Sequence, residues 1–156
     1  MIAKKQHKSL PQHYKIIVRP IPNGGPSKIL YDAPHKREVH EVNVAKRLSK
    51  FGHNIVFLKP SKIQGSKTAD CLWCSLVWEI KTITTSRSET VLRALKTATR
   101  QSNNIILDIS KSERSIYQVA ADVQNYLNRR SRGSKDKRIL IIGHKTYCQI
   151  GKNVII

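Results

Sequence analysis

The fold of this chain can be read outward from one stretch, Thr68-Ala-Asp-Cys-Leu-Trp-Cys-Ser-Leu-Val-Trp-Glu-Ile-Lys81. Its apolar and aromatic residues are typical of β-strands, and the break at Cys74-Ser75 predicts a hairpin that turns there. Alternate residues of a strand point to the same side of a sheet, so Glu79 and Lys81 are expected to share one face. The hairpin would also place Asp70 across from Glu79.

Asp70, Glu79 and Lys81 together suit one kind of chemistry. Carboxylates are the ligands that Mg²⁺ and Mn²⁺ prefer, and such an ion polarises a phosphodiester and lowers the pKa of a bound water. A nearby lysine can stabilise the charge that builds up on the phosphate. The spacing alone is loose, and an exposed cross-strand acid–base pair is the alternative. Because the chain has only ten acidic residues, an acid pair inside an apolar hairpin favours the functional interpretation.

A third carboxylate is predicted to join them. Glu41 recurs with Val44, Ala45 and Leu48 at helical spacing, so its side chain is expected to turn toward the sheet. A buried acid is costly unless it meets a cation or hydrogen-bond donors. The alternative is a glutamate in the first turn that interacts with the helix dipole.

The overall charge narrows the choice of partner. The chain of 156 residues carries 29 Lys and Arg against 10 Asp and Glu, a net charge of +19. This excess favours nucleic acid or an acidic protein as partner, and the N-terminal lysines and the basic loop 129–138 are expected to contact phosphates. No membrane partner is expected, because no segment combines the basic excess with a strong apolar helical face and no apolar run reaches the ~18 residues of a membrane span. The start of the chain lacks a secretory signal, which predicts action in the cytoplasm or a fragment of a larger exported protein.

Hydrophobic patterns predict the remaining elements. Helices are expected over about 41–51, 88–101 and 113–129, strands over 13–19, 53–58, 104–109 and 138–142, a polar loop over 61–67 and a closing hairpin over 147–156. Helices that alternate with buried strands predict an α/β fold, with a mixed central sheet flanked by helices on both faces. Residues 1–36, which are basic and rich in Pro and Gly, are predicted to be an N-terminal segment that precedes a domain over 37–156.

Four segments together resemble a known family. They are Glu41-Val-Asn-Val-Ala-Lys-Arg-Leu-Ser-Lys-Phe-Gly-His-Asn-Ile-Val-Phe-Leu58, Thr68-Ala-Asp70, Trp78-Glu-Ile-Lys81 and Arg100-Gln-Ser-Asn-Asn-Ile-Ile-Leu-Asp108. Their order and spacing over residues 37–145 resemble the C-terminal tRNase domains of contact-dependent growth inhibition toxins. Those domains belong to the PD-(D/E)XK, restriction-endonuclease-like superfamily. Ala69 stands where the superfamily signature has Pro, which affects the turn and not the ligands.

The resemblance implies a restriction-endonuclease-like fold and a metal-dependent endonuclease that cleaves tRNA as a toxin. Its implied catalytic residues are Glu41, Asp70, Glu79 and Lys81. Mg²⁺ or Mn²⁺ would be held by Asp70 and Glu79, with Glu41 completing or orienting the set. Gln101 and Asp108 also match family positions and are expected to contact substrate or support the site. The alternatives for these two residues are helix capping and an ion pair with a structural arginine.

Other interpretations stay open at this point. The same site could cleave DNA, or the chain could be a non-catalytic nucleic-acid-binding protein, for which +19 is sufficient explanation. A metal-free RNase would use His40 or His144. Cys71 and Cys74 form a C-x-x-C pair, but their position at the expected turn favours hairpin residues over a zinc site with His144 and Cys148. The expected partners are tRNA and an acidic immunity protein, and no oligomeric state is predicted.

Overall fold

The structure is a computed structural model that describes residues 16–24, 27–32, 37–60, 68–129 and 136–152. Several predictions lie wholly or partly outside these residues. They are the N-terminal lysines, the start of the strand over 13–19, the loop 61–67, most of the basic loop 129–138 and the last residues of the tail. Among the described residues, no helix has both the length and the apolar character needed to cross a membrane.

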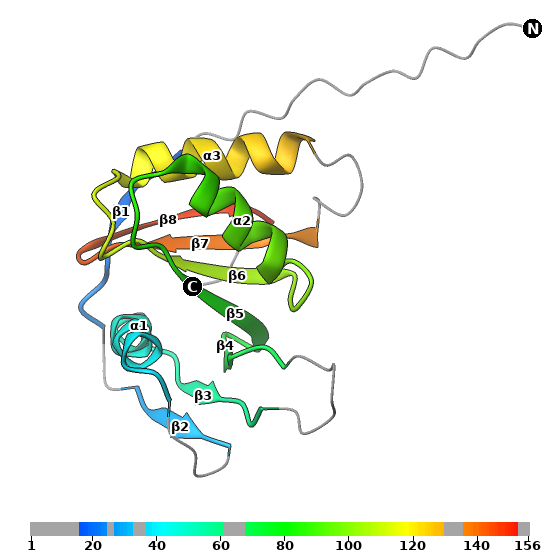
Figure 1. Ribbon diagram of the computed structural model, residues 1–156. Coiled ribbons are helices and arrows are strands. Elements are labelled where there is room, and N and C mark those ends of the chain that lie inside the picture. The colour runs from blue at the N-terminus through cyan, green and yellow to red at the C-terminus, as the bar shows by residue number, and fades with distance from the viewer. Residues whose placement is uncertain (1–15, 25–26, 33–36, 61–67, 130–135, 153–156) are drawn as a thin grey trace, which may run out of the picture.

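The described residues form eight strands and three helices. The strands are β1 (Arg19–Pro20), β2 (Ile29–Tyr31), β3 (Ile55–Phe57), β4 (Cys71–Trp73), β5 (Leu76–Thr82), β6 (Asn104–Asp108), β7 (Arg138–Ile142) and β8 (Thr146–Gly151). The helices are α1 (Val39–Ser49), α2 (Ser88–Ala98) and α3 (Ile116–Arg129). All eight strands join one sheet in the order β1-β8-β7-β6-β5-β4-β3-β2 (Figure 1). The predicted α/β architecture with a mixed sheet is therefore confirmed.

The sheet contains both parallel and antiparallel pairs of strands. The parallel pairs are β2–β3, β5–β6 and β6–β7, and a helix connects the two strands of each pair. This agrees with the need of parallel strands for a long crossover connection. The antiparallel pairs are β3–β4, β4–β5, β7–β8 and β1–β8.

The sheet separates two hydrophobic clusters. Neighbouring residues of one strand alternate between them: Ile105 packs with residues of α2 and α3, whereas Ile106 packs with residues of α1. In Figure 1, α2 and α3 lie beside β6 to β8, and α1 lies beside β3 and β2. Helices thus flank both faces, and the carboxyl end of α2 and the start of α1 both approach the β4–β5 hairpin.

The β4–β5 hairpin turns at Cys74 and Ser75, as predicted. Trp73 pairs with Leu76 to close a two-residue loop. The loop residues have φ angles of 52° and 60°, which is the left-handed region that a type I′ turn requires. Trp73 is 1% exposed and packs against the ring of Trp78, so the predicted hairpin residues supply core and turn.

The described residues near both ends of the chain belong to the same sheet. Residues 146–151 of the tail form β8, in which Tyr147 to Gly151 pair with β7, and the second half of the predicted closing hairpin (153–156) lies outside the described residues. Cys148 and Ile150 face the cluster of α2 and α3, so this strand continues the sheet and the chain reverses before it. The described part of the segment before residue 37 supplies both edges of the sheet, through β1 beside β8 and β2 beside β3.

Candidate functional site

The hairpin brings Asp70, Glu79 and Lys81 together. Asp70 precedes β4, and its backbone N–H donates to the carbonyl oxygen of Trp78 at 2.9 Å, which sets it opposite Glu79. The Asp70 carboxylate accepts a hydrogen bond from the Ile80 N–H at 2.8 Å. Lys81 Nζ lies 2.8 Å from Glu79 Oε1. The backbone of β5 therefore holds all three side chains at one end of the hairpin.

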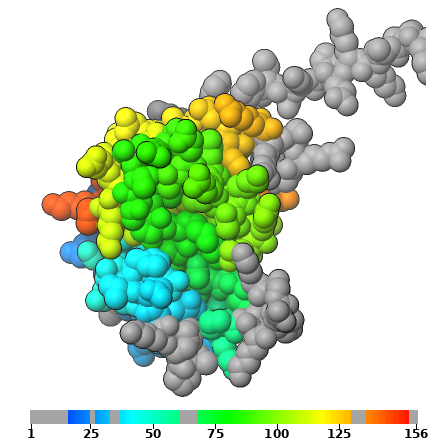
Figure 2. Space-filling model, viewed as in Figure 1, coloured from blue at the N-terminus to red at the C-terminus, as the bar shows by residue number. Residues whose placement is uncertain are grey.

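Glu41 reaches this group from α1. It lies in the first turn of the helix, and its side chain is 14% exposed. In the space-filling view, the cyan atoms of α1 adjoin the green atoms of the segment that carries β5 and α2 (Figure 2). The Asp70 carboxylate is close enough to act on the titration of Glu41, so the structure brings together all four residues predicted to be catalytic.

Burial and neighbouring charges shift the pKa values of two of these acids, Glu79 and Glu41. Burial raises the pKa of Glu79 from its ordinary 4.5 to about 7; the hydrogen bond from Lys81 lowers it, and the nearby Asp70 carboxylate raises it. Burial also raises the pKa of Glu41, the Asp70 carboxylate raises it further, and the Arg37 guanidinium opposes both. Three carboxylates, those of Glu41, Asp70 and Glu79, thus lie beside two cationic side chains, Arg37 and Lys81.

Gln101 contacts the same carboxylate from the other side. It follows α2, and its backbone N–H donates to the Ala98 carbonyl oxygen at 2.9 Å. With its side-chain amide nitrogen turned toward the sheet, Nε2 lies 3.0 Å and 3.1 Å from the two carboxylate oxygens of Glu79. The end of α2 therefore both closes the helix and orients Glu79.

Asp108 lies elsewhere. It ends β6, and its carboxylate lies 2.9 Å from the Arg47 guanidinium of α1. Arg47 also donates to the Gly143 carbonyl oxygen at 2.8 Å, and the Asp108 side chain is only 2% exposed. The ion pair with a structural arginine, which is the alternative for this residue, is what the structure shows, and Asp108 makes no contact with Glu79 or Lys81.

Arg37 is a member of the group that the sequence patterns miss. Its Nη1 lies 3.3 Å from Glu41 Oε2 and 3.6 Å from Asp70 Oδ1. Its Nη2 donates to the Leu58 carbonyl oxygen and, at 3.1 Å, to that of Asp70. The available signal is weak: Arg37 lies four residues before Glu41, but it precedes the first residue of α1, Val39.

The donor set suits a hard divalent cation. Carboxylate oxygens are the ligands of Mg²⁺ or Mn²⁺, whereas zinc sites of C-x-x-C type need thiolates. As arranged, no three His, Cys, Asp or Glu side chains in the described part of the chain converge on one point. Cys71 and Cys148 belong to clusters on opposite faces of the sheet, so the zinc alternative does not form. Arg37 Nη1 lies within 4 Å of both the Glu41 and the Asp70 carboxylates.

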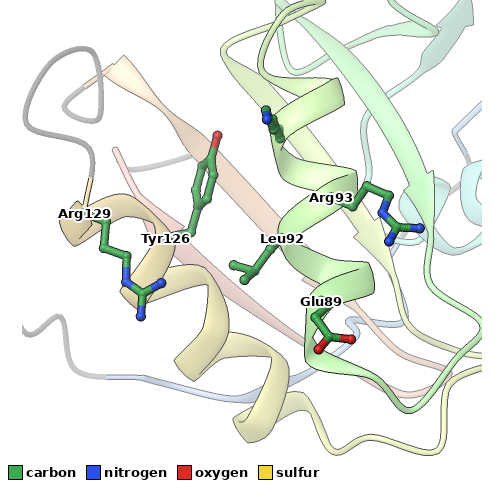
Figure 3. A pocket seen from close by; sticks show the side chains of 6 residues that line it. Glu89, Leu92, Arg93, Tyr126 and Arg129 are labelled. Carbon is green, nitrogen blue, oxygen red and sulfur yellow. The ribbon is translucent and has the colours of Figure 1, made fainter.

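A separate groove lies between α2 and α3 (Figure 3). Its volume is about 390 Å³, and its walls are Glu89, Leu92, Arg93, Lys96, Tyr126 and Arg129. In Figure 3, Leu92 extends from α2 toward α3, and Tyr126 and Arg129 come from α3. None of the residues predicted for the site lines it. Its three cations and one acid give it a net positive charge beside the helix that ends near Gln101.

Comparisons with known proteins identify the family of the chain and a similar fold. Residues 67–146, which include the hairpin of Asp70, Glu79 and Lys81, match the family model of the contact-dependent growth inhibition CdiA C-terminal domain. No curated protein matches the chain. A chain of the CdiA-CT/CdiI toxin and immunity complex from Burkholderia pseudomallei has a similar fold, with a TM-score of 0.53 and 14% sequence identity over 80% of this chain and 99% of that one. Because the family model covers more than half of the 156 residues, the chain belongs to the family of contact-dependent growth inhibition CdiA C-terminal domains.

Proposed function

We propose that this growth-inhibition domain acts as a metal-dependent endonuclease that cleaves RNA, with tRNA as its substrate. Membership of the family makes the chain a toxic effector domain. The observation that supports a hydrolytic nuclease is the position of Glu79, a buried acid between Asp70 and Lys81 whose pKa is raised to about 7. A purely structural ion pair would not gather further carboxylates around a buried acid, because each one destabilises the next. We also propose that the fold belongs to the restriction-endonuclease-like class.

The residues divide into three roles under this proposal. Asp70 and Glu79 would hold Mg²⁺ or Mn²⁺, and Glu41 would complete or orient the set; the ion would supply Lewis-acid activation of the phosphate and of a water. Lys81 stabilises the charge that builds up on the attacked phosphate. Gln101 holds the Glu79 carboxylate in one orientation, because its amide nitrogen donates to both oxygens of that carboxylate.

The choice of RNA rests on charge and on family resemblance. The net charge of +19 favours a phosphate polymer but does not distinguish RNA from DNA. The tRNase domains that the sequence resembles favour tRNA. The groove between α2 and α3 adds positive charge next to the helix that ends at the catalytic cluster, which suits the phosphates on either side of the cleaved bond.

A protein partner and a place of action follow from the same proposal. The structural neighbour is described as a toxin and immunity complex, and by analogy we propose an acidic immunity protein that neutralises this chain. Domains of this family are delivered into target cells, so the RNA would be cleaved in the cytoplasm of such a cell. Copurification with the product of a neighbouring gene, and loss of cleavage in its presence, would test the partner.

The test of the activity is direct. Purified protein is incubated with total tRNA and, in parallel, with plasmid DNA, each with Mg²⁺ and with EDTA. We expect cleavage of tRNA with Mg²⁺ alone, and loss of cleavage in Asp70→Ala with unchanged tRNA affinity. Cleavage of DNA only would favour the alternative substrate, and binding without cleavage under any divalent ion would favour a non-catalytic binding protein. Cleavage in EDTA at the full rate would contradict the proposed dependence on a metal ion.

A further inference from the structure

Arg37 is as deeply enclosed as the carboxylates it contacts. Its side chain is 9% exposed, and its guanidinium carbon lies 4.9 Å from the centre of the Phe57 ring. Its contacts come from three separate elements of the chain: α1 through Glu41, the residue after β3 through Leu58, and the residue before β4 through Asp70. An arginine with this many partners is held in one place.

The two ends of the guanidinium have different partners. Nη2 donates to two backbone carbonyl oxygens, those of Leu58 and Asp70, whereas Nη1 faces the carboxylates of Glu41 and Asp70. Nε has no hydrogen-bond partner among the described residues. One half of the group is therefore anchored to backbone that cannot be removed by a side-chain change. The other half donates a hydrogen bond to Glu41 at 3.3 Å and lies 3.6 Å from the Asp70 carboxylate.

The charged residues of the site divide into two sets. Lys81 Nζ lies 2.8 Å from the Glu79 carboxylate, so this lysine and this acid form one ion pair. Among the described residues, Arg37 is the side chain that makes ion pairs with both of the other acids, Glu41 and Asp70. Two carboxylates that face one another repel unless a cation stands between them. In the absence of an ion, Arg37 supplies that cation.

We propose that Arg37 is a positioning residue that holds Glu41 and Asp70 ready for a divalent ion and gives way at Nη1 when the ion binds. The proposal rests on the proposed function for the identity of the ion. Carboxylate oxygens that ligate Mg²⁺ lie ~2.1 Å from it, so a guanidinium nitrogen in contact with the same oxygens would repel the ion. The carbonyl contacts of Nη2 are compatible with either state, so they allow the group to turn without leaving the site.

The proposal predicts a direction that a merely structural arginine would not give. Replacing Arg37 with methionine, which keeps an apolar stem over Phe57 and removes the charge, should tighten Mn²⁺ binding by about tenfold or more, because the ion no longer competes with a resident cation. The same variant should be less stable without the ion, because Glu41 and Asp70 then repel. If Arg37 only tied α1 to the sheet, its replacement would lower the stability of the chain without any gain in ion affinity.

Arg47→Met is the matched control. Arg47 lies in α1, is also nearly buried, and also contacts both a carboxylate and a backbone carbonyl, but its acid is Asp108, which is not among the proposed metal ligands. Its loss should destabilise the chain by a similar mechanism and leave Mn²⁺ affinity unchanged. The comparison separates loss of a buried ion pair from loss of the competing cation.

The experiment measures the Mn²⁺ dissociation constants of the wild-type chain and of both variants by calorimetry at pH 8, without RNA. Tighter binding in Arg37→Met alone supports the proposal. Equal or weaker binding in Arg37→Met, with clear binding by the wild type, overturns it. Absence of Mn²⁺ binding in the wild type overturns the proposed nuclease function, and the inference with it.

A second measurement needs no variant and covers the case in which Arg37→Met does not fold. In the intact chain, the guanidinium ¹⁵N resonances of Arg37 should shift as Mg²⁺ is added. The midpoint of this shift should coincide with the midpoint of Mg²⁺ binding that calorimetry measures. The guanidinium resonances of Arg47 should stay constant. An Arg37 signal that does not move while Mg²⁺ binds would overturn the displacement at Nη1.

Discussion

Lys81 Nζ lies 2.8 Å from Glu79 Oε1, yet the pKa of that glutamate stands near 7. An ammonium at this distance favours the ionised carboxylate, so its effect alone would lower the pKa. Burial of Glu79, which is 3% exposed, and the neighbouring Asp70 carboxylate outweigh the lysine. The cluster is therefore arranged to attract a cation at the expense of its own stability in the absence of one.

Glu79→Gln should remove activity while keeping the shape of the side chain. Loss of a residue that supports a metal ligand typically costs 10- to 100-fold, so loss of the ligand itself should lower the tRNA cleavage rate by at least about 100-fold. Glu113→Gln is the matched control, since Glu113 is an exposed acid outside the site. Initial rates of tRNA cleavage with Mg²⁺ would be measured for both variants. Cleavage by Glu79→Gln at the rate of the wild type would show that Glu79 has no part in the mechanism.

The same substitution should change the pH dependence of stability. Because the folded pKa of Glu79 is near 7 and its ordinary value is 4.5, the folded chain binds more protons than the unfolded chain between these values. The free energy of unfolding contributed by Glu79 is therefore fully present below about pH 4.5 and falls as pH rises through 7. Glu79→Gln has no such loss, so in EDTA it should exceed the wild type by up to about 3 kcal/mol at pH 8. Urea titrations at several pH values would measure this, and a constant difference across pH would contradict it.

Asp108 should prove necessary for stability more than for cleavage. Its 2.9 Å ion pair with Arg47 joins the end of β6 to α1, and removing one partner leaves a charge buried without compensation. Asp108→Asn should therefore lower the free energy of unfolding by about 3–5 kcal/mol. Cleavage per folded molecule, measured below the melting temperature, should stay within about threefold of the wild type if Asp108 only stabilises the fold. A loss of the size seen for Glu79→Gln would instead give Asp108 a part in the reaction.

The residues that sequence patterns located are those whose partners are near in the chain. The hairpin of Asp70 and Glu79 was predictable because its strands, its turn and its alternation lie within fourteen residues of one another. Strands β1 and β2 have two and three residues, too few to show a period, and they pair with β8 and β3 across long separations.

Arg37 and Arg47 were missed for a related reason. Each is one of 29 basic residues, and in a chain so basic a single arginine carries little signal. Their partners Asp70 and Asp108 are brought to them by packing of α1 on the sheet, which no local pattern encodes.

The groove between α2 and α3 should contribute to RNA affinity and not to the cleavage step. In a Glu79→Gln background, Lys96→Ala should weaken tRNA binding and reduce the slope of log affinity against log salt by about 1, because one phosphate contact is lost. Glu89→Gln provides a control of opposite sign: it lines the same groove with a negative charge, so its removal should strengthen binding. Filter binding at several salt concentrations would measure both. Equal slopes in all three chains would place the RNA on another surface.

Ser75 should be a position where the chain can be stabilised without touching the site. Its φ of 60° is in the left-handed region, where a side chain with a Cβ costs about 1 kcal/mol and glycine costs little. Ser75 is exposed, so Ser75→Gly removes no packing and should raise the free energy of unfolding by about 0.5–1 kcal/mol. Ser75→Val should lower it, because a β-branched residue fits this region worst. Thermal unfolding would show the melting temperatures of the two variants shifted in opposite directions. Both should cleave tRNA as the wild type does, since the turn lies at the end of the hairpin away from Asp70 and Glu79.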